Sequence, residues 1–223
     1  MNAVRDSPDW ERRADVFAAE AIAQGEPTAW FERLYSAGRQ GDVSMPWDFT
    51  DANTLIVEWA AQRQLRGDGR RAVVVGCGLG RDSEFLGRLG FATTGFDIAE
   101  SAVEVVRSRY PDSPVHYQVA DVLNPPDRWE RSFDLVVESY TTQALPVTLR
   151  GQVTRAVQDL VAPGGTLLLI AVVQPDDAPP PQGPPWPLTR AEVDAFATDG
   201  LTAVEIVQID GASLRWRAEF RRA

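Results

Sequence analysis

One stretch, residues 72–82 (AVVVGCGLGRD), restricts the fold of this chain more than any other. The three valines at 73–75 predict a strand covered on both faces, because such strands are continuous apolar runs. Gly76, Gly78 and Gly80 follow at once, and a helical pattern begins just beyond them. Glycines at a strand-to-helix turn let a ligand approach the main chain closely. Because ligands of open α/β sheets bind at the carboxyl ends of strands, we expect a nucleotide-like cofactor here.

Strands and helices alternate after this turn, which predicts a parallel sheet wound with crossover helices. The predicted strands that follow cover residues 91–97, 115–119, 133–138 and 166–173. Two final strands, 201–209 and 213–220, are joined by Asp210-Gly211, a hairpin signal. We therefore predict an α/β fold with a Rossmann-like, doubly wound, seven-stranded, mostly parallel sheet that ends in an antiparallel hairpin.

Two proline- and glycine-containing stretches interrupt this pattern. Ala162-Pro-Gly-Gly165 is expected to form a turn before the fifth strand. Residues 174–187 are rich in proline and acid, so they are expected to stay out of the sheet as a lid or spacer. Thr189 is expected to cap the helix that follows.

The first 50 residues carry helical patterns and aromatic side chains and no strand. Gly38 is expected to end a short helix, and Asp51 can cap the next one. We predict that residues 1–50 form a helical cover over the site and that residues 51–223 form the rest of a single domain.

Composition excludes several classes of function. A net charge of −10 argues against a nucleic-acid partner, which normally needs a basic stripe. A single cysteine excludes an internal disulfide, and a single histidine excludes a histidine-rich metal site, so we predict no metal. No apolar run approaches the length of a membrane span and no signal peptide is present, so we expect a cytoplasmic protein without a membrane partner.

Two cofactors compete for the glycine turn. A dinucleotide site has the spacing G-x-G-x-x-G, but here Arg81 stands where the third glycine would fall. Asp97, at the end of the second strand, can accept both ribose hydroxyls of either cofactor. Asp121, after the third strand, is an extra carboxylate that could reach an adenine amino group. The terminal hairpin is unusual for a dehydrogenase.

Together these motifs resemble the class I S-adenosylmethionine-dependent methyltransferases over roughly residues 50–223. The matching stretches are Val73-Val-Val-Gly-Cys-Gly-Leu-Gly80, Gly95-Phe-Asp97, Ala120-Asp121, Phe133-Asp-Leu-Val136 and Ala162-Pro-Gly-Gly165. The resemblance implies S-adenosyl-L-methionine as cofactor. It implies a cofactor site formed by Trp47, Gly76, Cys77, Gly78, Gly80, Asp82, Asp97, Ile98, Asp121, Val122 and Glu138. One departure is Val74, where most members carry an acidic residue.

In lacking this acidic residue, the chain resembles the thiopurine, thiol and halide methyltransferase subgroup. Trp30, Gly38 and Pro46-Trp47-Asp48 match its N-terminal pattern in order, and Gly183-Pro-Pro-Trp-Pro187 is similar to its substrate-side loop. By this resemblance the acceptor is held by Tyr35, Trp47, Tyr140 and Trp186.

Methyl transfer from a sulfonium is an in-line displacement, so orientation and exclusion of water supply much of the rate. A thiol acceptor needs little help from a base, whereas a phenol or quinol benefits from one. The candidate catalytic residues are Tyr140, Asp48 and Glu138. His116 is expected at the far end of the third strand in a structural role, and Arg150 is expected to be solvated.

The sequence thus predicts methyl transfer to a small-molecule thiol or other soft nucleophile. The alternatives are an O-methyltransferase of a phenolic or quinol metabolite, a non-catalytic S-adenosylmethionine-binding protein and, least favoured, an NAD-dependent oxidoreductase. The sequence does not predict an oligomeric state.

Overall fold

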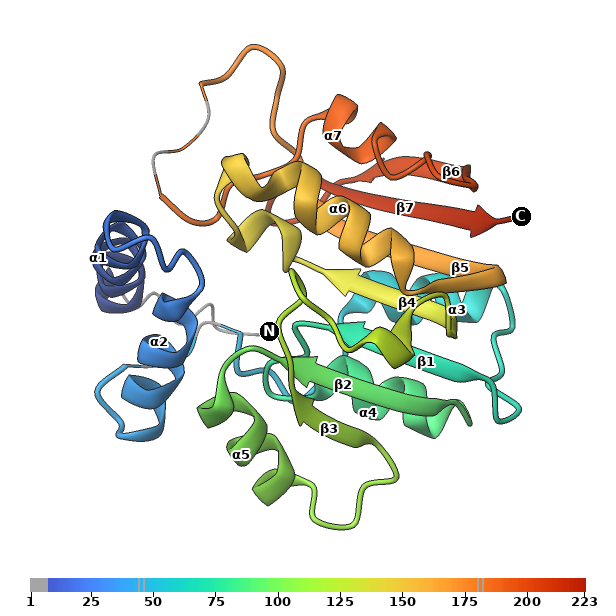
Figure 1. Ribbon diagram of the computed structural model, residues 1–223, viewed down its shortest axis with the longest axis horizontal. Helices are drawn as coiled ribbons and strands as arrows, with labels where there is room; N and C mark the ends of the chain where they lie inside the picture. The colour runs from blue at the N-terminus through green and yellow to red at the C-terminus, as the bar shows by residue number, and fades with distance from the viewer. Residues whose placement is uncertain (1–7, 44, 46, 180, 182) are drawn as a thin grey trace.

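A computed structural model describes residues 8–43, 45, 47–179, 181 and 183–223 (Figure 1). Its seven strands form one sheet in the order β3-β2-β1-β4-β5-β7-β6. Only β7 runs antiparallel to its neighbours, and the other pairings are parallel. The predicted fold class is confirmed. The strands are β1 (Arg71–Val75), β2 (Ala92–Asp97), β3 (His116–Val119), β4 (Phe133–Ser139), β5 (Val161–Val172), β6 (Leu201–Ile209) and β7 (Arg215–Arg222).

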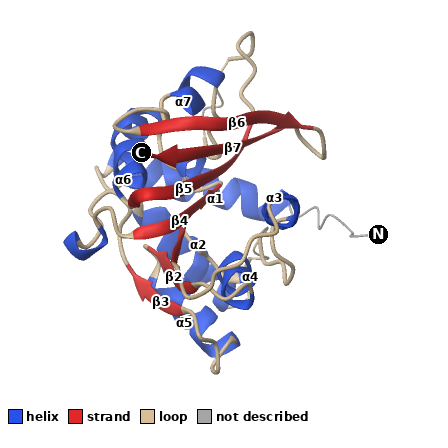
Figure 2. Ribbon diagram, turned by 90° about the vertical axis from the view of Figure 1, so that its right-hand side faces the viewer, coloured by secondary structure: helices blue, strands red, loops and turns tan. Residues whose placement is uncertain are grey.

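Helices cover both faces of the sheet (Figure 2). The valines of β1 explain why: Val73 and Val75 belong to one buried apolar cluster and Val74 to the other. The first cluster includes residues of α6 (Arg150–Asp159) and α7 (Arg190–Asp194). The second includes residues of α3 (Thr54–Gln62), α4 (Arg81–Arg88) and α5 (Glu100–Arg109). Three short 3₁₀ turns are η1 (Asp127–Trp129), η2 (Thr142–Ala144) and η3 (Val147–Leu149).

The first two helices, α1 (Pro8–Ala23) and α2 (Ala29–Arg39), lie beyond the carboxyl ends of β1, β2 and β4 (Figure 1). The Glu32 carboxylate of α2 accepts from the Ser101 amide at 3.0 Å, in the first turn of α5, where negative charge is favoured. An ion pair joins Arg39 to Glu104 on the same two helices. Polar contacts therefore fix α2 on α5.

Three local predictions differ from the structure. Gly38 lies inside α2, which continues to Arg39, because a single glycine weakens a helix without ending it. Residues 162–165 lie within β5 as a bulge, since the ladder pairs Phe133 with Val161 and then Leu135 with Thr166. The helix α3 is capped by Asn53, whose side chain accepts from the Leu55 amide, and not by Asp51.

Val173 and Leu188, which flank the stretch 174–187, pair with each other in an isolated parallel β-bridge. The predicted terminal hairpin is confirmed, and so is the Thr189 cap, which forms a capping box with Glu192. No helix among the described residues has the length and apolarity that a bilayer crossing requires.

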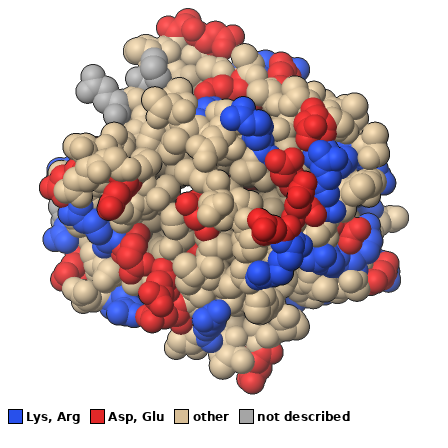
Figure 3. All heavy atoms as spheres, viewed as in Figure 1, with Lys and Arg blue, Asp and Glu red and all other residues tan. Residues whose placement is uncertain are grey.

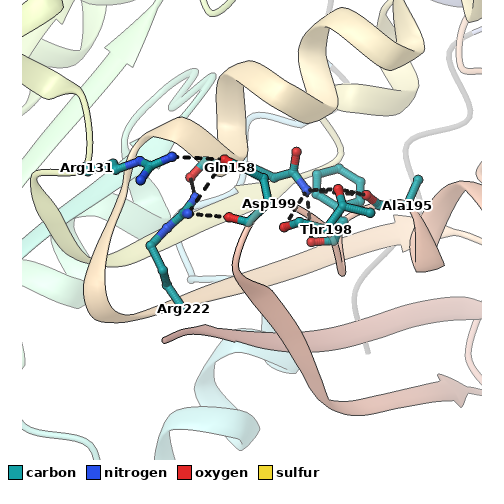
Figure 4. A network of polar contacts seen from close by, with 7 residues as sticks. Arg131, Gln158, Ala195, Thr198, Asp199 and Arg222 are labelled. Atoms are coloured by element: carbon teal, nitrogen blue, oxygen red, sulfur yellow. Dashed lines mark hydrogen bonds and ion pairs between the residues drawn. The ribbon is translucent and has the colours of Figure 1, made fainter.

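At the amino-end side of the sheet, a polar network holds the last strand to α6 (Figure 4). Arg222 donates to the Gln158 carbonyl at 2.7 Å, in the last turn of α6, where carbonyls lack helical partners. The Gln158 side chain donates to the Thr198 hydroxyl at 2.8 Å, and Arg131 pairs with Asp199 at 3.1 Å. This network stabilises β7 and β6 far from the glycine turn.

The capping assignment can be tested by stability. Asn53→Ala should lower the free energy of unfolding by about 1 kcal/mol, the usual contribution of an N-cap side chain. Asp51→Ala, an exposed control, should change it by less than about 0.5 kcal/mol. Denaturant titration of the two variants measures the difference, and equal losses would contradict Asn53 as the cap.

Candidate active site

The glycine turn after β1 has the backbone that the sequence predicted. Gly76, Gly78 and Gly80 have φ of +59°, +50° and +89°, a region that side-chain-bearing residues rarely adopt. A Cβ at Gly76 would lie 2.3 Å from the Thr141 hydroxyl, which itself donates to the Val75 carbonyl at 2.9 Å. The turn after β1 is therefore interlocked with the turn after β4.

Asp97 ends β2 directly beside this turn. Its Oδ2 accepts from the Gly78 amide at 2.9 Å and its Oδ1 from the Ala99 amide at 3.0 Å. The carboxylate is 6% exposed, and this burial raises the pKa of Asp97 to about 6 against the lowering effect of the amides. The position suits a ribose-binding carboxylate.

Tyr35 and Trp47 lie over the same turn from the N-terminal segment. The Trp47 indole donates to the Tyr35 hydroxyl at 2.8 Å, and that hydroxyl lies 2.8 Å from where a Cβ of Gly78 would stand. Burial, then the nearby Asp97 carboxylate, raises the pKa of Tyr35. The structure thus places Tyr35, predicted on the acceptor side, next to the predicted ribose side. Pro46 of the same motif lies outside the described residues.

The turn after β4 is built on Glu138. Its Oε1 accepts from the Thr142 amide at 2.7 Å, at the start of η2. The side chain is 0% exposed, and burial raises the pKa of Glu138 to about 7 although the amides of Thr142 and Thr141 and the charge of Arg150 lower it. Oε2 of Glu138 and the Thr142 hydroxyl are buried and make no hydrogen bond to any described residue.

Tyr140 lies on the other face of the sheet, against the α3–α4 cluster. Nearby, the Asn53 amide group donates to the Ser139 hydroxyl at 3.2 Å, and the Asn53 backbone donates to Asp82 at 2.7 Å. Burial raises the pKa of Asp82, opposed by Arg81 and by this amide. Asp82 therefore holds the start of α3 against the start of α4.

The structure shows the burial or polar contacts of four further residues that were predicted to bind the cofactor. Asp121 is half-buried and accepts from the Leu123 amide at 2.8 Å, and the neighbouring Val122 is buried. Cys77 is a buried free thiol whose pKa is raised by burial and by Asp97. Ile98 donates a backbone amide to Asp97. Their roles in binding stay predictions.

Asp48 and His116 lie away from the acceptor side. Asp48 is exposed and pairs with Arg109 of α5 at 2.8 Å, a position that does not favour a catalytic base. His116 is exposed at the start of β3 beside Gln118, as predicted.

Arg150 is a residue whose role the sequence did not predict, because its partners are distant in the chain. It is 7% exposed, not solvated, and donates to the carbonyls of Thr142 and Trp186 and to Glu192 at 3.1 Å. Trp186 is buried, and its amide donates to the Gln143 carbonyl at 2.6 Å. Arg150 thus fixes the loop that contains Trp186 onto the turn after β4.

These residues fit an adenosyl cofactor. The carboxyl ends of β1 and β2 bring together a positive-φ glycine turn and the Asp97 carboxylate, and the third glycine begins α4. A glycine turn at a helix start suits a ligand that approaches the main chain, and Asp97 suits a pair of vicinal hydroxyls. A narrow opening in the surface lies between the N-terminal helices and the sheet (Figure 3).

Comparison with known proteins identifies a domain. Residues 72–165 match the family model described as a methyltransferase domain. These residues form a methyltransferase domain, and the chain is similar to S-adenosylmethionine-dependent methyltransferases. The chain is 37% identical over 119 residues to a ubiquinone biosynthesis O-methyltransferase of Xanthomonas campestris, covering 52% of this chain and 48% of that protein. The chain thus spans about half the length of that relative.

Two further methyltransferases are similar. Thiocyanate methyltransferase 1 of Brassica oleracea is 29% identical over 143 residues, which is 62% of this chain and 62% of that protein. A structure of the 1,6-didemethyltoxoflavin-N1-methyltransferase of Burkholderia thailandensis, with bound S-adenosylhomocysteine, has a TM-score of 0.66 and 15% identity, covering 100% of this chain and 93% of that one. At that identity the structural likeness establishes the fold.

The Asp97 carboxyl predicts a pH dependence of cofactor binding. Ribose hydroxyls donate to the ionised form, so affinity for S-adenosylhomocysteine should fall as pH drops through about 6. The pKa of Asp97 is higher in the folded protein than in the unfolded chain. Asp97 therefore contributes stability to the ligand-free protein below about pH 4, and this contribution is lost as pH rises through about 6. Calorimetry between pH 5 and 8 measures the affinity, and Asp97→Asn should abolish this part of the pH dependence. An unchanged profile in that variant would contradict the assignment.

Because the two turns interlock, two glycine substitutions should lower the free energy of unfolding by unequal amounts. Gly164, with φ of +72°, has open space around its missing Cβ, so Gly164→Ala should cost about 1–2 kcal/mol from backbone strain alone. Gly76→Ala should cost roughly 1 kcal/mol more, because Thr141 must also leave the Val75 carbonyl. Denaturant unfolding of both variants checks this, and equal costs would argue against the interlock.

Proposed function

We propose that this protein transfers the methyl group of S-adenosyl-L-methionine to a small-molecule thiol or another soft nucleophile. The observation that carries the proposal is the state of the predicted bases Asp48 and Glu138 and of the neighbouring Asp82. Asp48 pairs with Arg109, Asp82 accepts from the Asn53 amide, and one oxygen of Glu138 accepts from the Thr142 amide. A thiol acceptor needs no strong base, since part of it is already thiolate near neutral pH.

The cofactor supplies an electrophilic methyl group when it is bound. Gly76, Gly78 and Gly80 would line its path along the main chain, and Asp97 would hold its ribose hydroxyls. Tyr35 and Trp47, joined by their hydrogen bond, would exclude water from this side. Tyr140 and the loop of Trp186 would position the acceptor for an in-line approach.

Two relatives support different accepting atoms. The Brassica oleracea protein is named for thiocyanate, which favours a soft nucleophile, whereas the Xanthomonas campestris protein is named for O-methylation. Methylation of a phenol or quinol is therefore the second candidate. It is favoured by the unpartnered Oε2 of Glu138 together with a pKa raised to about 7, since a base works best with a pKa near the working pH.

The N-terminal helices are proposed as a cover of the site. The proposal is supported by Tyr35 over Gly78, by Glu32 on the start of α5 and by the Arg39–Glu104 ion pair. The predicted small-molecule substrate and cytoplasmic location stay predictions.

A matched acceptor panel tests the accepting atom. Release of S-adenosylhomocysteine should occur with thiols such as thiophenol and should be at least about tenfold slower with the matched phenols near pH 7, because the phenol is almost fully protonated there. Glu138→Gln should leave thiol turnover within about threefold, since it retains an acceptor for the Thr142 amide.

Turnover confined to phenols or quinols, and lost in Glu138→Gln, would contradict the thiol proposal and support the second candidate. Binding of S-adenosylhomocysteine without turnover of any acceptor would instead support a non-catalytic binding protein.

A further inference from the structure

Tyr140 adopts a backbone conformation that its residue type disfavours. Its φ is +66°, although it is a bulky non-glycine residue in the turn directly after β4. Such conformations cost free energy and persist where the surrounding structure holds them, often at ligand-binding positions. The Tyr140 amide donates to the Ile170 carbonyl of β5 at 2.9 Å, which fixes the backbone. The ring is thereby directed onto the α3–α4 face of the sheet.

Arg81 lies on that face at a position that helices disfavour for a cation. It is the first residue of α4, where the helix dipole is positive and acidic residues are preferred. Its ion pair with Asp82 is long, at 3.7 Å, and its guanidinium lies 5.0 Å from the centre of the half-exposed Phe49 ring. A cation at a helix N-terminus that has no close ion-pair partner departs from the usual preference, and such departures are expected at functional positions.

Arg215 approaches the same tyrosine from another strand. It begins β7 opposite Val172 of β5, two residues beyond the Ile170 that holds Tyr140, so it points to the same face. Among the described residues Arg215 forms no ion pair or side-chain hydrogen bond, whereas Arg217 on the same strand pairs with Glu205. Arg215 and Arg81 both act electrostatically on the Tyr140 phenol and lower its pKa, against the larger raising effect of burial.

Arginine side chains act on Tyr140 from two elements. Arg81 and Arg215 lower the pKa of Tyr140, and Asp82, which pairs with Arg81 at 3.7 Å, opposes them. Arg215 has no carboxylate partner among the described residues. Guanidinium groups bind carboxylates through paired N–H donors, which gives geometric specificity as well as affinity.

We propose that Arg81 and Arg215, beside Tyr140, bind a carboxylate group of the methyl acceptor, so that the acceptor is an anionic aromatic or aliphatic thiol. The assignment rests on the proposed methyl transfer. The sheet order supports the acceptor as the source of the carboxylate. Arg215 on β7 is four strands from Asp97 on β2, about 19 Å at the usual strand spacing, so it lies far from the predicted ribose side. Arg81, in contrast, directly follows Gly80 of the glycine turn, so the amino-acid carboxylate of the cofactor is the competing source of the charge.

Matched ligands separate these sources. Initial rates are measured for 2-mercaptobenzoate and for thiophenol, which lacks the carboxylate, with wild type, Arg215→Gln, Arg81→Gln and the exposed control Arg221→Gln of the same strand. Arg215→Gln should raise KM for 2-mercaptobenzoate about tenfold or more, as expected for loss of a bond to a charged group, and leave thiophenol unchanged. Arg81→Gln should act in the same direction, and Arg221→Gln should have no effect. Equal changes for both thiols, or none, would overturn the proposal.

Binding without turnover provides an independent readout. Calorimetry of 2-mercaptobenzoate in the presence of S-adenosylhomocysteine should show weaker binding to Arg215→Gln than to wild type, even if no thiol is methylated, so the carboxylate site and the proposed reaction fail separately. Affinities for S-adenosylhomocysteine and for 5′-methylthioadenosine, which lacks the amino-acid part, should be unchanged in Arg215→Gln. If the variant weakened S-adenosylhomocysteine alone, the carboxylate would belong to the cofactor and the acceptor assignment would be wrong.

Discussion

The contact between the turns after β1 and β4 is the constraint on which the site depends. Thr141 fits against Gly76 only because that residue has no Cβ, and its hydroxyl donates to the carbonyl of Val75. The turn after β4 is also held by two other side chains: Glu138 accepts from the Thr142 amide, and Arg150 donates to the Thr142 carbonyl. Arg150 also donates to the Trp186 carbonyl, so the glycine turn, the turn after β4 and the loop before α7 are one connected unit. A change in any of them would displace the cofactor side and the acceptor side together.

Burial raises the pKa values of two carboxyl groups in and beside this unit. The carboxyl groups of Asp97 and Glu138 have pKa values raised to about 6 and about 7, because loss of water outweighs the amides that they accept from. These groups hold backbone turns, and Asp97 is placed to hold ribose hydroxyls as well. The cations Arg81 and Arg215 lie on the other face, around Tyr140. The carboxyl edge of the sheet therefore carries buried carboxyl groups at the ends of β2 and β4 and arginines at the starts of α4 and β7.

Local signals predicted much of this arrangement. The valine run, the positive-φ glycines, Asp97 at a strand end, the terminal hairpin and the Thr189 cap each follow from interactions within a few residues, and the structure has them. The failures have a common cause. Asp51 and Asn53 are equally good caps by residue type, and Asn53 is the cap because Asp82 and Ser139 also hold it. Arg150 was expected to be solvated because its partners at positions 142, 186 and 192 are not visible in a local window.

The sequence by itself determined the order of strands and helices, the glycine turn and the resemblance to S-adenosylmethionine-dependent methyltransferases, because periodicity and turn chemistry are local properties. The tertiary structure alone decided which side chains meet at the carboxyl edge. It brought Tyr35 to Gly78 and paired Asp48 with Arg109 at the surface. It also placed Arg215 beside Tyr140, although 75 positions separate them in the chain. Such contacts depend on strand order and helix docking, and these are set by the packing of the whole core.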